Sequence, residues 1–232
     1  MTTPAYHGRV RTVGTVVSVN VGRPRDVERN GRPATTAIWK TPVSDRIQAR
    51  GVNLDGDDQA DREAHGGPDK AVYAYATEDH QWWETDLERT IDVGAFGENL
   101  TTEGIDLTAA VIGERWQVGG TVLEVSEPRL PCWRLNLRMN DTRFVQRFTA
   151  AGRPGTYLRI IEPGDIGAGD PIEILSSPDH GMTVGEVAHI FRHDRPAADR
   201  LLAVGDLSDA WKAWAQSTVA RQRPNDPCPG CE

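Results

Sequence analysis

The sequence predicts a mainly β protein of the α+β class, with short strands forming a barrel or sandwich and a small helical element at the C-terminus. Two observations support this. Over the first two thirds of the chain, short segments rich in β-branched residues alternate with Gly- and Pro-containing turns. After Ser176 the apolar residues recur at helical spacing instead. A chain of 232 residues can form one main core with an appendage.

Six segments have the alternation or the β-branched content of strands. They are Thr12–Val19, Ala71–Ala76, Arg115–Val118, Thr121–Ser126, Thr156–Ile161 and Pro171–Leu175. Two helices are expected to interrupt them. Thr77 is expected to cap the first, which carries acidic residues in its first turn. Asp141 is expected to cap the second, with Gly152 as its end.

The last part of the chain predicts three short helices. Thr183 and Glu186 have the spacing of a capping box, Ala198–Val204 forms a second helix, and Ser208 caps a third with two tryptophans on one side. A helical element this small rarely folds alone, so it is expected to pack on the barrel or on a partner subunit of a homodimer. The predicted divisions are 1–176 for the barrel, 177–222 for the helices and 223–232 for a flexible tail.

Composition limits the classes of partner. The net charge of −8 argues against a nucleic acid or a membrane surface as the main partner. No apolar run approaches the roughly 18 residues of a membrane span, and the N-terminus lacks the apolar region of a secretory signal. Three cysteines do not make a disulfide framework. We therefore expect a reduced, cytoplasmic setting.

Cys132 is the cysteine that stands apart from the C-terminal end of the chain, in the segment SEPRLPCWRLN. Pro128 and Pro131 stiffen this loop, and Arg129 and Arg134 place positive charge on both sides of the thiol. A rigid, cationic and partly exposed setting favours the thiolate, which can attack an electrophile, carry sulfur or bind a soft metal. The alternative is a buried structural cysteine.

Four further segments occur in an order and spacing typical of a known family. They are IWKTPV (Ile38–Val43), NLDGDDQA (Asn53–Ala60), HGGPDKAVYAY (His65–Tyr75) and FGENLTTEGID (Phe96–Asp106). Together with the cysteine loop, they resemble the MOSC domain, which is related to the C-terminal part of molybdenum-cofactor sulfurases. The resemblance is closest to the stand-alone YiiM-type members and extends from about Val13 to about Val219. It implies a MOSC-type β-barrel with flanking helices and a three-helix C-terminal appendage.

The basic residues in or beside these motifs would form a cationic pocket if the barrel brings them together. Such a pocket suits a phosphorylated ligand, Gly66 and Gly67 let a ligand approach the backbone, and Asn99 can hydrogen-bond a ring edge. The residues expected to bind the cofactor are Lys40, Arg46, His65, Gly66, Gly67, Lys70, Tyr73, Asn99 and Arg129. The alternatives are ordinary turns, solvated charges and strand packing.

The resemblance implies molybdenum cofactor as the ligand and Cys132 as the catalytic residue, either as a molybdenum ligand or as a persulfide carrier. YiiM-type members are associated with reducing N-hydroxylated compounds, such as hydroxylaminopurines, to amines. The sequence carries no Rossmann or ferredoxin signature, so the expected electron donor is a separate flavoprotein or iron–sulfur reductase. Pyridoxal phosphate is not expected. The competing hypotheses are a non-catalytic cofactor carrier or sulfur-transfer module, and a cysteine-dependent transferase or hydrolase.

Two further cysteines, Cys228 and Cys231, lie four residues or fewer from the end of the chain. Their spacing suits a redox pair or half of a zinc site, but the sequence holds no second pair of cysteines to complete four ligands. We therefore expect both to be dispensable, with an electron relay as the alternative.

Overall fold

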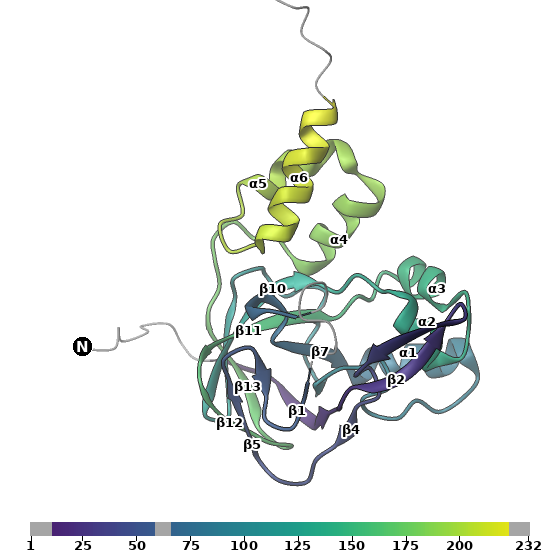
Figure 1. Cartoon of the computed structure of the whole chain (residues 1–232). Helices are drawn as coiled ribbons and strands as arrows, with labels where there is room; N and C mark the ends of the chain where they lie inside the picture. Colours follow the sequence, from purple (N-terminus) through teal and green to yellow (C-terminus); the bar gives the residue numbers. More distant parts are fainter. Residues whose placement is uncertain (1–10, 59–65, 223–232) are drawn as a thin grey trace, which may run out of the picture.

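The computed structural model describes residues 11–58 and 66–222, and within them seven strands close a mixed barrel (Figure 1). Around the barrel the strands follow the order β1, β13, β9, β10, β11, β7 and β8, and β8 pairs again with β1. The β7–β8 pair is parallel and the others are antiparallel. Their bounds are β1 Arg11–Val21, β7 Val72–Ala76, β8 Leu100–Glu103, β9 Arg115–Val118, β10 Thr121–Pro128, β11 Thr156–Glu162 and β13 Pro171–Ser176. The predicted mainly β barrel is confirmed.

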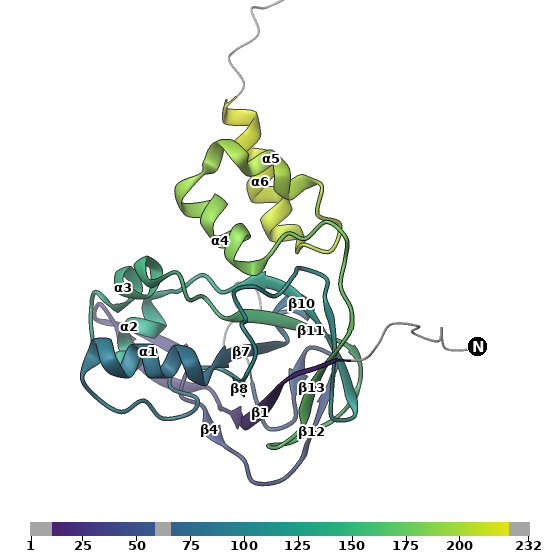
Figure 2. The ribbon, with the colours of Figure 1, turned by 180° about the vertical axis from the view of Figure 1, so that it is seen from behind.

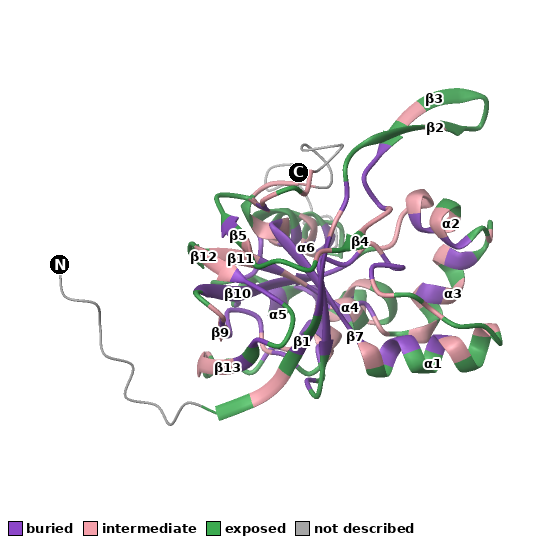
Figure 3. Cartoon of the chain, turned by 90° about the horizontal axis from the view of Figure 1, so that it is seen from below, coloured by how far each residue is buried: buried purple, intermediate pink, exposed green. Residues whose placement is uncertain are grey.

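Short strands extend the barrel at its edges. β4 (Thr41–Pro42) pairs with the end of β1, and β12 (Gly164–Ile166), β5 (Ile47–Arg50) and β6 (Asn53–Leu54) form a small sheet. β2 (Arg25–Arg29) and β3 (Arg32–Thr36) form a hairpin that projects from the body with mostly exposed residues (Figure 3). Its turn places Asn30 and Gly31 in the left-handed region, as an Asn-Gly hairpin turn requires.

Three helices lie beside one side of the barrel (Figures 1 and 2): α1 (Thr77–Leu87), α2 (Trp133–Met139) and α3 (Phe144–Ala151). They bury a second apolar cluster against β7, distinct from the core of the barrel. The aromatic rings of Trp83, Phe96 and Phe144 lie at its centre and are fully buried. This cluster holds the β10–α2 loop, which carries Cys132, against the barrel wall.

Two predicted caps differ from the structure. α1 begins at Thr77 itself with Ala76 as its N-cap, because the Thr77 hydroxyl donates to the carbonyl of Thr102 on β8 at 3.1 Å. α3 begins at Phe144 with Arg143 as its N-cap, because Asp141 accepts from the Arg143 amide at 2.8 Å and so stabilises the turn before the helix. The predicted end of α3 is confirmed, since Gly152 is its left-handed C-cap.

The C-terminal helices pack on the barrel beside β10 and share its core (Figures 1 and 2). α4 (Val184–His193) begins with the predicted capping box of Thr183 and Glu186. The second predicted helix is a 3₁₀ turn followed by α5, and α6 begins one residue after Ser208. The bounds are η2 Arg195–Ala198, α5 Asp199–Leu202 and α6 Asp209–Gln222. No helix in the described part of the chain is long and apolar enough to cross a membrane.

Candidate functional site

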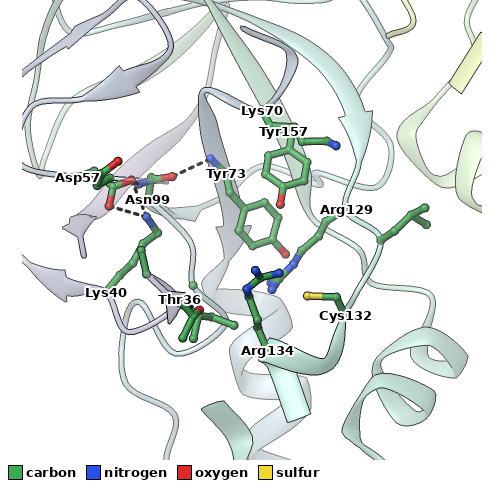
Figure 4. A pocket seen from close by; sticks show the side chains of 15 residues that line it. Thr36, Lys40, Asp57, Lys70, Tyr73, Asn99, Arg129, Cys132, Arg134 and Tyr157 are labelled. Carbon is green, nitrogen blue, oxygen red and sulfur yellow. Dashed lines mark hydrogen bonds and ion pairs between the residues drawn. The ribbon is translucent and has the colours of Figure 1, made fainter. Parts of the chain in front are cut away.

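A pocket opens where the β3–β4 connection, the residues directly after β6 and the β10–α2 loop meet β7 and β11 (Figure 4). Most of its lining side chains are polar or charged, and four of them are basic. The lining residues are Thr36, Ala37, Ile38, Lys40, Asp57, Asp58, Lys70, Tyr73, Gly97, Asn99, Arg129, Leu130, Cys132, Arg134 and Tyr157. The barrel therefore brings together residues that lie up to 121 positions apart in the sequence.

Cys132 is positioned by the end of β10 and the start of α2, where it is the N-cap residue in an extended conformation. Its thiol forms no disulfide and is partly exposed in the pocket. Figure 4 shows the sulfur pointing toward the guanidinium groups of Arg129 and Arg134. The predicted cationic surroundings of Cys132 are thus present in the structure.

Arg129 is the most buried cation of the site, with 7 % of its surface exposed. Its guanidinium lies 4.7 Å from the centre of the Tyr73 ring and donates a hydrogen bond to the carbonyl of Phe96. Cation–π attraction strengthens when water is excluded, so this stacking helps to hold a charge that burial would otherwise disfavour. Lys70 approaches from the other side, on the 3₁₀ turn η1 (Pro68–Lys70), with its ammonium 3.6 Å from Glu127.

Lys40 forms a buried ion pair with Asp57 across the pocket floor (Figure 4). The Lys40 ammonium lies 2.6 Å from both carboxylate oxygens, and Asp57 also accepts from the Gly22 amide at 2.7 Å and from Asn99 at 2.8 Å. Burial lowers the pKa of Lys40, and the Asp57 carboxylate offsets only part of that effect. The charge of Lys40 is therefore compensated within the fold.

Two phenols face the basic residues. Burial raises the pKa of Tyr73 far above its usual value and raises that of Tyr157 to about 12, although Arg129 opposes both shifts. Both phenols therefore stay protonated at neutral pH. The Tyr73 hydroxyl donates to the carbonyl of Pro154 at 2.8 Å, so it is the face of its ring that meets Arg129.

Two expected site residues, Arg46 and Asn99, differ from their predicted roles. Arg46 lies outside the pocket, because Asp165 and Asp170 hold its guanidinium beside β12. Asn99 lines the pocket, but both of its donors are used, toward Asn20 and Asp57, and its oxygen accepts from the Tyr73 amide at 3.1 Å. It therefore ties β1, β7 and the Asp57 loop together, and it is not free to read a ring edge.

The glycine motif, Gly66 and Gly67, precedes Lys70 but does not itself line the pocket. Gly67 has φ +93° and accepts the 3.2 Å hydrogen bond that closes the turn carrying Lys70. His65 lies outside the described residues, as do Cys228 and Cys231. Asp57 and Tyr157 also line the pocket, and the sequence analysis did not predict these roles, because the other pocket residues are distant in the chain.

The donor set suits a cofactor that brings its own metal ligands. In residues 11–58 and 66–222, no group of three or more His, Cys, Asp or Glu side chains could hold a bare metal ion. Cys132 offers one soft sulfur ligand, and the basic side chains around it suit an anionic group. The enclosed part of the pocket, about 100 Å³, is smaller than the ~300–1,000 Å³ of most small-molecule sites, so only part of a pterin would fit inside it.

Comparison with known proteins identifies the family. The MOSC domain family model matches residues 61–173. The Bacillus subtilis protein YflK is 36 % identical over 202 residues, which cover 86 % of this chain and 91 % of that protein. Protein YiiM of Escherichia coli is 33 % identical over 187 residues, covering 78 % of this chain and 82 % of YiiM. A Gibberella moniliformis protein named "Reductase" is 34 % identical over 186 residues, but the chain spans only 32 % of its length.

Solved structures agree with these sequence relatives. The crystal structure of YiiM from Geobacillus stearothermophilus superposes with a TM-score of 0.75 and 27 % identity, covering 89 % of this chain and 99 % of that one. YiiM from Escherichia coli gives a TM-score of 0.72 and 26 % identity, with 92 % and 96 % coverage. The pocket residues from Lys70 to Tyr157 lie within the segment that the family model matches, whereas Lys40 and Asp57 precede it. The chain therefore belongs to the MOSC domain family and resembles its YiiM members over most of its length.

Proposed function

We propose that this protein binds molybdenum cofactor in the cationic pocket and reduces N-hydroxylated compounds to amines. The observation that carries the proposal is the partly exposed Cys132 thiol, which faces Arg129 and Arg134 in the pocket of a MOSC barrel. The named "Reductase" among its relatives supports an oxidoreductase activity. The proposed electron donor is a separate flavoprotein or iron–sulfur reductase.

The chain's own residues would hold the cofactor and position the substrate. Cys132 would give one sulfur ligand to the metal, and Arg134 and Lys70 would donate charge-assisted hydrogen bonds to the anionic part of the cofactor. Arg129, which stacks on the uncharged ring of Tyr73, would keep the pocket electropositive. Lys40 is neutralised by Asp57, so the main role of this ion pair would be to hold the pocket floor in place. The protonated phenol of Tyr157 would act as a hydrogen-bond donor at the same wall.

When bound, the cofactor would supply the two-electron chemistry of oxygen removal. The reaction balances as one N-hydroxylated compound, two electrons and two protons giving one amine and one water. The N–O bond breaks, the nitrogen is reduced, and the oxygen leaves as water. The pocket walls would exclude bulk water from this step, and the basic residues would favour an anionic ligand over a neutral one.

Purification from a host that makes molybdenum cofactor tests the proposal. We expect molybdenum and pterin in the purified protein and reduction of a hydroxylaminopurine with a chemical reductant. Loss of a residue that only supports a metal ligand can lower activity by about 10–100-fold. Loss of the ligand itself should lower it at least as much, so Cys132→Ala should reduce turnover by about 100-fold or more. Arg46→Gln is the matched control, because Arg46 lies outside the pocket and should leave cofactor content and turnover unchanged.

The outcome also separates the alternatives. Protein that contains cofactor but does not turn over the substrate would be a carrier. An additional sulfur atom on Cys132, seen by mass spectrometry, would indicate a persulfide and sulfur transfer. Absence of both molybdenum and pterin, or near-full turnover by Cys132→Ala, would overturn the proposed function.

A further inference from the structure

A cavity of about 330 Å³ lies between α3, α4 and the loop that precedes Cys132, and we call it the α3–α4 cavity. Its volume is within the ~300–1,000 Å³ typical of small-ligand sites. Arg129 and Leu130 line both this cavity and the cationic pocket, whereas Cys132 lines the cationic pocket but not this cavity. The two spaces are therefore separate and meet at this loop.

Cationic side chains gather at the α3–α4 cavity. The described residues that line it include three arginines and two histidines but no aspartate or glutamate; the five are Arg129, Arg153, His189, Arg192 and His193. The whole chain has a net charge of −8, so this local excess of basic residues is opposite to the overall balance. Arginine is always protonated, and a histidine ring can donate an N–H in either protonation state. The cavity therefore suits a negatively charged ligand.

Two of these arginines lack a carboxylate partner. Arg153 forms an ion pair with Asp79 at 2.5 Å, but neither Arg129 nor Arg192 forms one within the described residues. The Arg192 guanidinium donates to the hydroxyl of Thr149, which joins α4 to α3 beside the cavity. Burial lowers the pKa of Arg192, and no neighbouring carboxylate opposes this shift. An anion bound in the cavity would supply the missing negative charge.

The rest of the lining is mainly apolar. Phe148 of α3 and Pro154 are buried, and Leu130 of the loop before Cys132 is 42 % exposed. A ligand with an apolar body would cover the open surface of Leu130 and pack against Phe148. A small inorganic anion would leave this apolar surface in contact with water. The cavity therefore favours an organic anion over an inorganic one.

Small residues of α4 leave room for the cavity. Gly185, Ala188 and Arg192 lie at positions i, i+3 and i+7, so they share one face of the helix, and all three line the cavity. The Gly185 amide donates to the Thr108 carbonyl at 2.9 Å, and a Cβ at Gly185 would lie 2.6 Å from the methyl group of Thr108. This close approach fixes α4 against the loop between β8 and β9. The walls of the cavity are therefore held by the fold itself.

We propose that the α3–α4 cavity binds a small organic anion, with its carboxylate or phosphate group at Arg192 and its apolar body against Phe148 and Leu130. Charge-assisted hydrogen bonds from the guanidinium would hold the anionic group. The bound anion would touch the loop that carries Cys132, so it would be a second ligand beside the candidate active site. The proposal goes beyond the proposed function and does not rest on it, because none of these contacts involves the cofactor or the thiol.

Calorimetry on the purified full chain, without cofactor, tests this site. Benzoate and phenyl phosphate are the probes, and benzamide is the uncharged counterpart of benzoate with nearly the same shape. We expect benzamide to bind about tenfold or more weakly than benzoate, because it carries no negative charge. We expect inorganic phosphate to bind about tenfold or more weakly than phenyl phosphate, because it has no apolar body. The tighter of the two probes identifies the preferred anionic group.

Two variants change the site itself. Arg192→Gln should weaken the binding of both probes by about tenfold or more, since hydrogen bonds between charged groups are lost. Ala188→Leu should weaken it by a similar factor, because the larger side chain occupies part of the cavity. The matched controls are Arg195→Gln and Ala220→Leu, which alter exposed residues that do not line the cavity and should bind both probes within about twofold of the parent. Thermal unfolding of each variant separates a lost contact from a lost fold.

Arg134→Gln distinguishes this cavity from the cationic pocket, because Arg134 lines the pocket and not the cavity. If the parent binds neither probe, if benzamide binds as tightly as benzoate, or if Arg192→Gln binds both probes as the parent does, the proposal is wrong. It is also wrong if Arg134→Gln weakens binding and Arg192→Gln does not, because the anion then occupies the cationic pocket. Binding that is weakened in Arg192→Gln and kept in Arg134→Gln supports the site, even if the protein contains no molybdenum and does not reduce N-hydroxylated compounds.

Discussion

Asp57→Ala should be among the most destabilising single changes in the candidate site. The Asp57 side chain is 2 % exposed and that of Lys40 is 9 % exposed, so the ion pair is almost removed from water. The substitution leaves the Lys40 ammonium, one donor of Asn99 and the Gly22 amide without their acceptor. Breaking a buried pair by removing one partner costs about 3–5 kcal/mol. For a chain of this size, that corresponds to a fall in Tm of roughly 6–20 °C.

A matched control lies two residues away. Asp55 pairs with Arg50 at 2.9 Å, but their side chains are 43 % and 66 % exposed. Exposed pairs contribute about 0–1 kcal/mol, so Asp55→Ala should change the free energy of unfolding by no more than that. Denaturant unfolding of both variants, followed by tryptophan fluorescence, gives the two values. If Asp57→Ala costs no more than Asp55→Ala, the buried pair does not stabilise the pocket as argued.

Asp57→Ala should also change how the stability of the protein depends on pH. Burial already lowers the pKa of Lys40 in the parent, and loss of Asp57 removes the interaction that opposes this shift. The folded variant therefore releases the Lys40 proton at a lower pH than the folded parent does, while both unfolded chains release it near 10.5. Stability of the variant rises with pH over that range, so the deficit relative to the parent should shrink from pH 7 toward pH 10. A deficit independent of pH would show that Lys40 is not the group left uncompensated.

Two further predictions concern Tyr157 on β11 and Gly155 directly before it. The pKa of Tyr157 is about 12 in the folded chain and 10.0 without burial, so the parent loses stability as pH rises above 10. Tyr157→Phe should remove at most about 1.4 kcal/mol of that loss at pH 11, an upper limit because the ring is partly exposed; an unchanged pH profile would contradict this. Gly155→Ala should cost more than about 2 kcal/mol, because φ is +62° and a Cβ would lie 2.5 Å from the Ala74 carbonyl. Gly152→Ala, with φ +66° and no atom within 4 Å of its Cβ, is the control and should cost only about 1 kcal/mol in thermal unfolding.

The strands of the barrel could be predicted because their signals are local. Alternating apolar residues bounded by Gly and Pro indicate β9, β10, β11 and β13 without knowledge of their partners. The capping box of α4 is equally local, since Thr183 and Glu186 satisfy each other's backbone amides. Each of these predictions depends on residues within one turn or one strand.

Several elements were not predicted, among them the barrel strand β8, the short strands β4, β5, β6 and β12, the β2–β3 hairpin and α2. The last two were missed for different reasons. The β2–β3 hairpin had a signal, the Asn30–Gly31 pair, whose left-handed conformations suit a tight hairpin turn. α2 had little signal in the sequence, because it has only seven residues and follows two prolines. It is stabilised mainly by Leu135 and Met139, which pack into the aromatic cluster. Sequence propensity does not contain that tertiary contribution.

The charged residues of the site show a second limit. The sequence places Lys40 and Arg46 six positions apart with similar surroundings, yet one faces the pocket and the other faces away. Their carboxylate partners decide this: Asp57 holds Lys40 on the pocket side, and Asp165 and Asp170 hold Arg46 beside β12. Those partners are 17 residues away in the first case and 119 and 124 in the second. Only the fold determines which pairs meet.

The C-terminal helices contribute to the surroundings of Cys132. The segment matched by the family model, 61–173, contains Cys132 and both phenols, but it stops before α4 and α6. Phe191, Trp211 and Trp214 therefore lie outside the matched segment, and they form the helix side of a cavity of about 310 Å³ that Cys132 also lines. The helices also contribute to the main core, so they are fixed relative to the thiol. The appended helices therefore help to shape the space beside Cys132, which the matched segment does not enclose by itself.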